Sequence, residues 1–228
     1  MNIVQNLLKI KELVFKSEAS QQSLVITAGS FITSGIMAVA MILLSRFLGP
    51  EKFGVFSVSI SLMFVISKFA DLGLNQLIPR FMGQWFFQKK KNEEFLKYIL
   101  WLKTIFSIVL LLIFFPASGF LSQLINYPHL EMIYWAIIGS IFIEIYSYSY
   151  LVLSSRHQFL QLSLLGILQA LIKLISFGVI IWFFSSNLLS ITAFYYLAPA
   201  VAVLIISFFL KEKIFYKPKI ANHKIRAE

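Results

Sequence analysis

The chain has 228 residues, of which 59% are hydrophobic and 13% are charged, and its formal net charge is +10. The charged fraction is about half that of a soluble globular domain, which excludes water as the main solvent, and the lack of cysteine excludes disulfides, thiol catalysis and cysteine-ligated metal. Lysine and arginine lie between apolar blocks instead of on one basic face, so they indicate membrane topology, and we expect no nucleic-acid partner.

Residues 1–22 carry several charged side chains and are too polar for a cleaved signal peptide. The spacing of Val4, Leu7, Leu8 and Lys11 fits an amphipathic helix lying at the membrane interface, and it fits a polar lead-in without helical structure equally well. We predict that residues 1–22 form a cytoplasmic amphipathic lead-in.

Six blocks reach the roughly 20 apolar residues that a helix needs to cross the hydrocarbon layer of a membrane. They are residues 24–45, 54–78, 98–119, 132–153, 160–184 and 189–210. The predicted fold class is therefore all-α: a polytopic membrane helix bundle with one six-helix lobe over residues 23–210 and a basic tail over residues 211–228. Lysine and arginine concentrate before the first block, after the second and after the sixth, so both termini are predicted to be cytoplasmic.

Ionisable residues inside these blocks are the strongest functional signal, because a charge near the bilayer centre costs at least about 2.5–3.5 kcal/mol on insertion scales. Lys103 lies near the predicted start of its helix, so we expect it to extend to the interface. Lys68 and Asp71 are spaced to form an ion pair that is either structural or part of a binding site. Glu144 and Lys173 have matched depths on consecutive helices, and we predict that they pair with each other.

Two amides, Asn75 and Gln169, lie on the same helix faces as these charges. Cations held in a low dielectric favour phosphate oxygens, so an interior surface with more lysines than acids suits an anionic head group. The predicted substrate-binding residues are Lys68, Asp71, Asn75, Glu144, Gln169 and Lys173.

Enzyme signatures are missing from the chain. Asp71 is the only aspartate, which excludes a metal site built on paired aspartates, and the three histidines have no metal-ligand spacing. No phosphate-binding glycine motif occurs. We therefore expect a protein that is not an enzyme, with no metal and no cofactor.

The run "SRFLGPEKFGVFSVSISLMFVISKFADLGLNQLIPRFMGQ", residues 45–84, resembles the start of the polysaccharide transporter family, the flippases of O-antigen and other lipid-linked oligosaccharides. These proteins have an Arg-x-Leu-Gly-Pro turn, an aromatic-Gly pair and an Asp-Leu-Gly-Leu element followed by an arginine. The residues that carry the resemblance are Arg46, Gly49, Pro50, Gly54, Asp71, Gly73 and Arg80, and Phe53 stands where the family usually has tyrosine.

The resemblance implies a multi-pass protein of the bacterial inner (plasma) membrane that moves undecaprenyl-pyrophosphate-linked oligosaccharide for surface polysaccharide biosynthesis. Family members have two six-helix lobes around a cationic cavity, and this chain resembles one amino-terminal lobe. Besides the lipid-linked oligosaccharide and membrane lipid, the implied partner is therefore a second lobe, either a carboxyl-terminal half or another subunit. Two alternatives remain open: a lobe of a cation-coupled multidrug exporter, and a membrane assembly subunit that does not transport.

Overall fold

The computed structural model describes residues 18–84, 89–183 and 188–209, and every regular element within these ranges is a helix. Five of the described helices are long and apolar enough to cross a membrane. These findings confirm the predicted all-α membrane helix bundle. The helices are α2 (Glu18–Asp71), α3 (Leu74–Gln84), α4 (Lys89–Phe114), α5 (Ser118–Leu124), α6 (Leu130–Ser155), α7 (Phe159–Phe183) and α8 (Leu188–Phe209).

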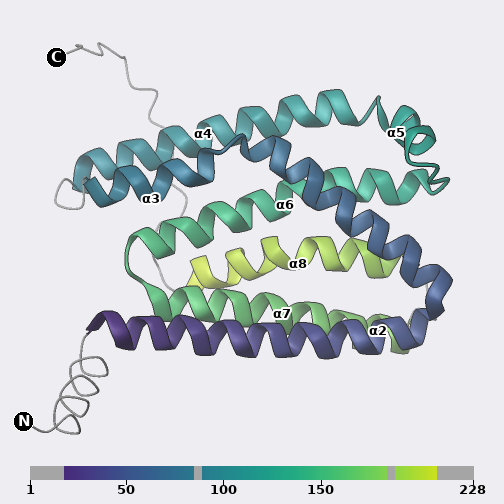
Figure 1. Cartoon of the computed structure of the whole chain (residues 1–228), viewed down its shortest axis with the longest axis horizontal. Helices are drawn as coiled ribbons and strands as arrows, with labels where there is room; N and C mark the ends of the chain where they lie inside the picture. Colours follow the sequence, from purple (N-terminus) through teal and green to yellow (C-terminus); the bar gives the residue numbers. More distant parts are fainter. Residues whose placement is uncertain (1–17, 85–88, 184–187, 210–228) are drawn as a thin grey trace, which may run out of the picture.

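A sharp bend at Gly49 divides α2 into a first arm, residues 18–48, and a second arm, residues 50–71. Gly49 has φ 73° and ψ 170°, a conformation that residues with a Cβ rarely adopt. Pro50 then begins the second arm, where a missing N–H group does no harm because the first N–H groups of a helix have no partner within it. The second arm turns back across the bundle (Figure 1). The first arm contains the predicted span 24–45 and the second arm contains most of the predicted span 54–78, and their separate crossing of the membrane stays a prediction.

A second break follows at Leu72 and Gly73, so the predicted helix over residues 54–78 is wrong in its extent. The backbone has φ 42° at Leu72 and 81° at Gly73, which ends α2 at Asp71 and redirects the chain into α3. Oδ1 of Asp71 accepts a hydrogen bond from the backbone N–H of Asn75 at 3.1 Å. Asp71 thereby satisfies one N–H group in the first turn of α3, as a capping side chain does.

The remaining apolar blocks match helices of the structure with shifted ends. The block predicted over residues 98–119 begins nine residues earlier, because α4 starts at Lys89, and α5 follows as a separate short helix. The described chain ends, Glu18 and Phe209, lie at one end of the bundle, and the bend at Gly49 and α5 lie at the other (Figure 1). Which end is cytoplasmic stays a prediction, and the lead-in up to residue 17 and the basic tail lie outside the described residues.

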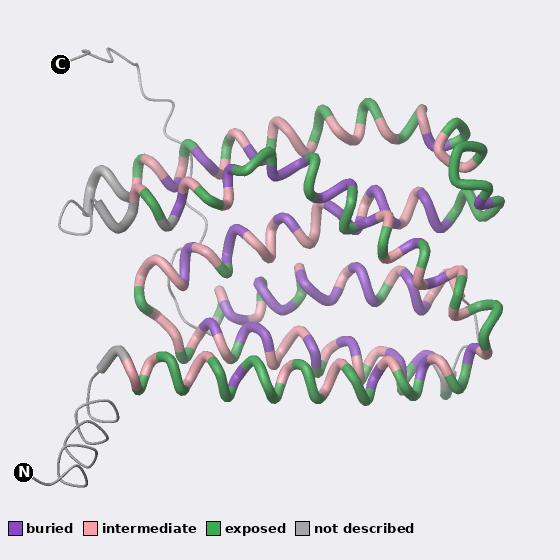
Figure 2. The backbone as a smooth tube through the Cα atoms, viewed as in Figure 1, coloured by how far each residue is buried: buried purple, intermediate pink, exposed green. Residues whose placement is uncertain are grey.

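The buried residues concentrate on the helices at the centre of the bundle, and the first arm of α2 presents a largely exposed face (Figure 2). Ser59, which is fully buried, accepts a hydrogen bond from the Tyr196 hydroxyl at 2.6 Å and donates one to the Met132 carbonyl at 3.0 Å. This contact joins the second arm of α2 to α6 and α8. The Tyr127 hydroxyl, in the loop before α6, donates to the Val55 carbonyl at 2.7 Å. Burial raises the pKa of Tyr127 to about 12, so its hydroxyl stays protonated to a higher pH than that of an exposed tyrosine.

Candidate functional site in the membrane interior

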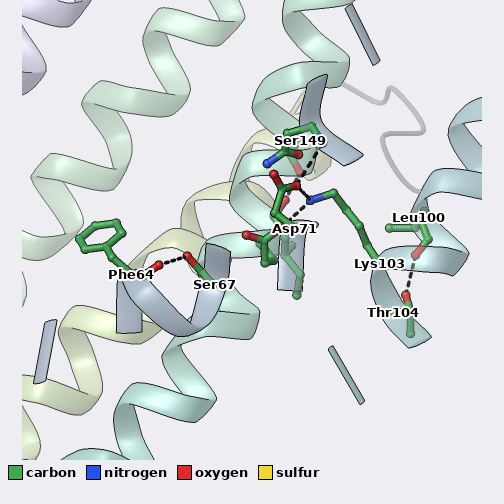
Figure 3. Close-up of polar contacts among 10 residues, drawn as sticks. Phe64, Ser67, Asp71, Leu100, Lys103, Thr104 and Ser149 are labelled. Carbon is green, nitrogen blue, oxygen red and sulfur yellow. Dashed lines mark hydrogen bonds and ion pairs between the residues drawn. The ribbon is translucent and has the colours of Figure 1, made fainter. Parts of the chain in front are cut away.

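Three charged side chains from three helices meet inside the bundle. The Lys103 ammonium on α4 donates to Oδ1 of Asp71 at 3.0 Å and to Oε2 of Glu144 at 2.5 Å. Asp71 ends α2 and Glu144 lies on α6, and all three residues are buried, with exposed fractions of 4% for Lys103, 8% for Asp71 and 5% for Glu144. Figure 3 shows Lys103 extending from its helix towards Asp71. We call Asp71, Lys103 and Glu144 the ionic triad.

The ionic triad contains two carboxylates and one ammonium, so its net charge is −1 when all three groups are ionised. An uncompensated charge in a low dielectric is costly, and it is relieved either by protonation of one carboxyl group or by a second cation. The side-chain Oδ1 of Asn75 is also buried, and no hydrogen-bond partner for it occurs among the described residues. Asn75 is joined to Asp71 through its backbone, so this acceptor belongs to the same region of the fold. The arrangement is chemically able to bind and release a proton.

The predicted ion pair between Glu144 and Lys173 is wrong, because Glu144 pairs with Lys103. The Lys173 ammonium instead lies 3.9 Å from the centroid of the Tyr195 ring, and Lys173 forms no ion pair within the described part of the chain. A cation over an aromatic face is attracted by the ring's electron density. Glu144 and Lys173 were predicted to have equal depth in the membrane, but depth does not give the direction of a side chain around its helix axis. That direction decides which residue each one contacts.

The expectation that Lys103 extends to the interface is also wrong. It depended on a helix beginning near residue 98, whereas α4 begins at Lys89 and places Lys103 about 21 Å along its axis. The central residue of the triad was therefore misjudged because of an error in one helix boundary. The apolar block alone could not reveal the true start, since the first turns of α4 are rich in lysine, asparagine and glutamate.

Of the other predicted binding residues, Lys68, Gln169 and Lys173 are not members of the ionic triad. Lys68 is exposed on the second arm, and Asp71 pairs with Lys103 instead of with Lys68. Gln169 is half-buried on α7. Lys68 is near enough to Glu144 to act on it electrostatically, whereas Lys173 lies apart over the Tyr195 ring, so the predicted net-positive surface is not one cluster. Contact of any of these residues with a substrate stays a prediction.

The motif residues fall into two groups. Gly49 and Pro50 form the bend of α2, and Asp71 and Gly73 form the break between α2 and α3, so each pair has a direct conformational role. Three others, Arg46, Gly54 and Arg80, are exposed, and nothing in the structure explains them.

Residues 19–227 match the family described as polysaccharide biosynthesis protein. No curated protein matches the chain, and no solved structure matches it. The family match covers nearly all of the chain, including the helices beyond residue 90 that carry none of the quoted motifs. Together with the five membrane-length helices, the bend at Gly49 and the break at Gly73, this match shows that the chain belongs to the polysaccharide biosynthesis protein family, as a multi-pass membrane protein.

Proposed function

We propose that this chain is a flippase for lipid-linked oligosaccharide, or the amino-terminal lobe of one, in the bacterial inner membrane. The proposed substrate is an undecaprenyl-pyrophosphate-linked sugar unit that crosses from the cytoplasmic to the periplasmic leaflet. Membership of a polysaccharide biosynthesis family supports this role, as does a chain made largely of membrane-length helices. A second lobe, on another chain or in a longer protein, completes the transport path in this proposal.

The observation that carries the proposal is the ionic triad at the α2–α3 break. A purely anchoring bundle has no need for two buried acids and a buried lysine, because apolar residues of the same volume pack without the cost of desolvation. Here Asp71 binds both Lys103 and the first turn of α3, so the charge state of the triad is linked to the position of α3. Protonation of one acid is a means of coupling proton movement to a change in helix packing.

Lys68 is the proposed contact for the pyrophosphate group. It is exposed on the second arm, three residues before Asp71, so its cation is accessible to a ligand while the triad lies buried behind it. Lys68→Ala is expected to abolish export of surface polysaccharide with near-normal protein abundance, and Lys68→Arg to retain part of it because the charge is kept. Lys52→Ala, which also removes an exposed lysine from the second arm, is the matched control. Normal export by Lys68→Ala would contradict this role.

Deletion of the gene in its own host tests the function whether the chain acts alone or as one lobe. A flippase defect stops surface polysaccharide and leaves the finished lipid-linked sugar unit in the cytoplasmic leaflet, where it accumulates. We therefore expect loss of surface polysaccharide together with a rise in extractable lipid-linked oligosaccharide. Loss of polysaccharide without this rise would indicate an earlier biosynthetic step, and unchanged polysaccharide would reject the proposal.

A further inference from the structure

A half-open pocket of about 180 Å³ lies between the first arm of α2, α6 and α7. It is lined mainly by hydroxyl-bearing residues and glycines, and none of its lining residues is charged. The residues that matter here are Ser30, Thr33, Ser34, Tyr146, Tyr150, Ser163 and Gly166. Tyr150 and Ser163 are within a few residues of the ends of α6 and α7, and Ser30 and Ser34 lie near the middle of the first arm of α2, so the pocket lies in the half of the bundle that holds the described chain ends.

The wall formed by α2 carries hydroxyl groups that the fold leaves available. Thr33 donates back to the Gly29 carbonyl at 2.8 Å, as serine and threonine on helices commonly do. Ser30 and Ser34 are exposed, and neither makes a hydrogen bond in the described part of the chain. Hydroxyl groups facing hydrocarbon have no water to bind, so this exposed pair needs a polar partner, which a ligand or a water-filled space supplies.

The opposite wall is aromatic. Tyr146 and Tyr150 are one turn apart on α6, and their ring centroids are 6.3 Å apart at an interplanar angle of 34°. The face of an aromatic ring is electron-rich, so it attracts the weakly positive C–H groups on the flat side of a pyranose ring, while the tyrosine hydroxyls hydrogen-bond with sugar hydroxyls. Hydroxyl groups on one side and aromatic rings on the other are the chemistry that recognises a neutral sugar.

Glycine sets the depth of the pocket. A Cβ added at Gly166 would lie 3.1 Å from Oγ1 of Thr33, and one added at Gly29 would lie 2.5 Å from Cβ of Ser163. The first arm of α2 and α7 therefore approach too closely at Gly29 and Gly166 for larger side chains, and the space beside these glycines stays open for a ligand.

The pocket is separate from the ionic triad. Glu144 and Tyr146 are two residues apart on α6, so their side chains point about 200° apart around the helix axis. Glu144 faces Lys103 on α4, whereas Tyr146 faces the first arm of α2 and α7. The neutral pocket and the charged triad thus lie on opposite sides of the same helix, and an anionic group has no cation to bind in the pocket.

We infer that this pocket binds a single neutral sugar ring of the lipid-linked oligosaccharide. That the sugar belongs to a lipid-linked oligosaccharide rests on the proposed function. That the ligand is a neutral sugar rests on the hydroxyl groups and aromatic rings of the pocket itself. The site holds the sugar part of the head group in the half of the bundle that is predicted to be cytoplasmic, while other residues contact the pyrophosphate.

Photolabelling of the full chain in phospholipid nanodiscs tests this site. The probe is an alkyl glucopyranoside with a diazirine on the sugar ring, and the protein is purified in a detergent without a sugar head group, since such a head group would occupy the pocket. Mass spectrometry should locate the label in residues 26–34, 146–150 or 162–166, and excess methyl glucopyranoside should suppress it. A phosphocholine lipid with the same diazirine serves as the control probe.

Variants make the test specific to the pocket. Ser30→Ala combined with Ser34→Ala should reduce labelling about tenfold, because each lost hydrogen bond weakens binding by about fivefold and the two losses are only partly additive. Tyr150→Leu, which removes one ring, should also reduce labelling, whereas Tyr150→Phe keeps the ring and should retain most of it. Ser45→Ala lies on the same arm outside the pocket and should label like the parent chain.

Equal labelling of these segments by the phosphocholine probe, without competition by sugar, would show a lipid site and overturn the inference. Absence of label from all three segments would also overturn it. The outcome is independent of the gene deletion described above. Sugar-specific labelling with unchanged polysaccharide would reject the flippase and keep the sugar site, and the reverse pattern would reject the sugar site and keep the flippase.

Discussion

Lys103 and Glu144 are separated by 41 positions in the chain, and their charged groups meet at 2.5 Å in the bundle interior. Because Lys103 also binds Asp71, one ammonium holds α4 against both α6 and the end of α2. A buried cation shared by two acids leaves each acid dependent on the same partner, so the loss of that partner has a larger effect than the loss of either acid.

Lys103→Met should lower the free energy of unfolding in detergent by about 3–5 kcal/mol, because it leaves Asp71 and Glu144 buried without a cation. Lys52→Met, which removes an exposed lysine near the bend of α2, should change the unfolding free energy by less than about 1 kcal/mol. Denaturation followed by circular dichroism measures both values. Similar values for the two variants would mean that the triad contributes little to stability.

Glu144→Gln should interact strongly with Lys103→Met and not with Lys173→Met. In the first double variant the buried acid loses its charge along with its partner, so the combined loss of stability should fall short of the sum of the single losses by about 1–3 kcal/mol. Lys173 contacts the Tyr195 ring and not Glu144, so the second pair should be additive to within about 0.5 kcal/mol. Two double-mutant cycles from unfolding curves measure the coupling energy of Glu144 with Lys103 and with Lys173. Coupling of Glu144 to Lys173 alone would contradict the described geometry.

Gly73→Ala should destabilise the fold by about 1–2 kcal/mol, since Gly73 has φ 81° and a Cβ is strained in that conformation. Gly54→Ala is the matched control, because Gly54 lies within a helix with open space around the added Cβ. It should leave stability unchanged or raise it by up to about 1 kcal/mol. Thermal unfolding of both variants separates a conformational requirement at the break from a general effect of glycine replacement.

A reporter that is active only in the cytoplasm should give signal when fused after Asn92 or after the carboxyl tail. It should give none when fused after Asn126 or Asn187, because basic residues favour the cytoplasmic side. Asn126 lies in the turn between α5 and α6, at the end of the bundle opposite the described chain ends. Signal at Asn126 would overturn the predicted orientation.

Tyr127→Phe should make unfolding less sensitive to high pH. Burial raises the pKa of Tyr127 from 10.0 to about 12 in the folded chain, so its contribution to stability is complete below pH 10 and is lost as the pH rises through 12. At pH 11 this loss is about 1 kcal/mol for the parent chain and absent for the variant. Unfolding free energies at pH 8 and pH 11 measure the difference, and equal pH responses would show that Tyr127 titrates normally.

The sequence by itself determined the fold class and the break between the first two apolar blocks, whereas the break at Gly73 inside the predicted span 54–78 appeared only in the structure. A membrane interior forces backbone polar groups into helices, so apolar blocks of sufficient length specify helices without further information. Glycine followed by proline at positions 49 and 50 indicates a break, because proline does not continue a helix and glycine adopts the required backbone conformation. The sequence also identified Asp71, Glu144 and Lys173 as charges inside apolar blocks, and it placed Glu144 and Lys173 far from any predicted loop.

Only the tertiary structure decided which charges meet. Position along a helix gives depth in the membrane, but the direction of a side chain around the axis depends on how each helix rotates to bury its small residues, as Gly29 does against Ser163. The partner of Glu144 is therefore Lys103 on α4 instead of Lys173 on α7. The predicted helix start near residue 98 had placed Lys103 too close to the membrane interface. The neutral pocket has the same origin: its serines and tyrosines are ordinary on each helix alone, and they form a site because three helices bring them together.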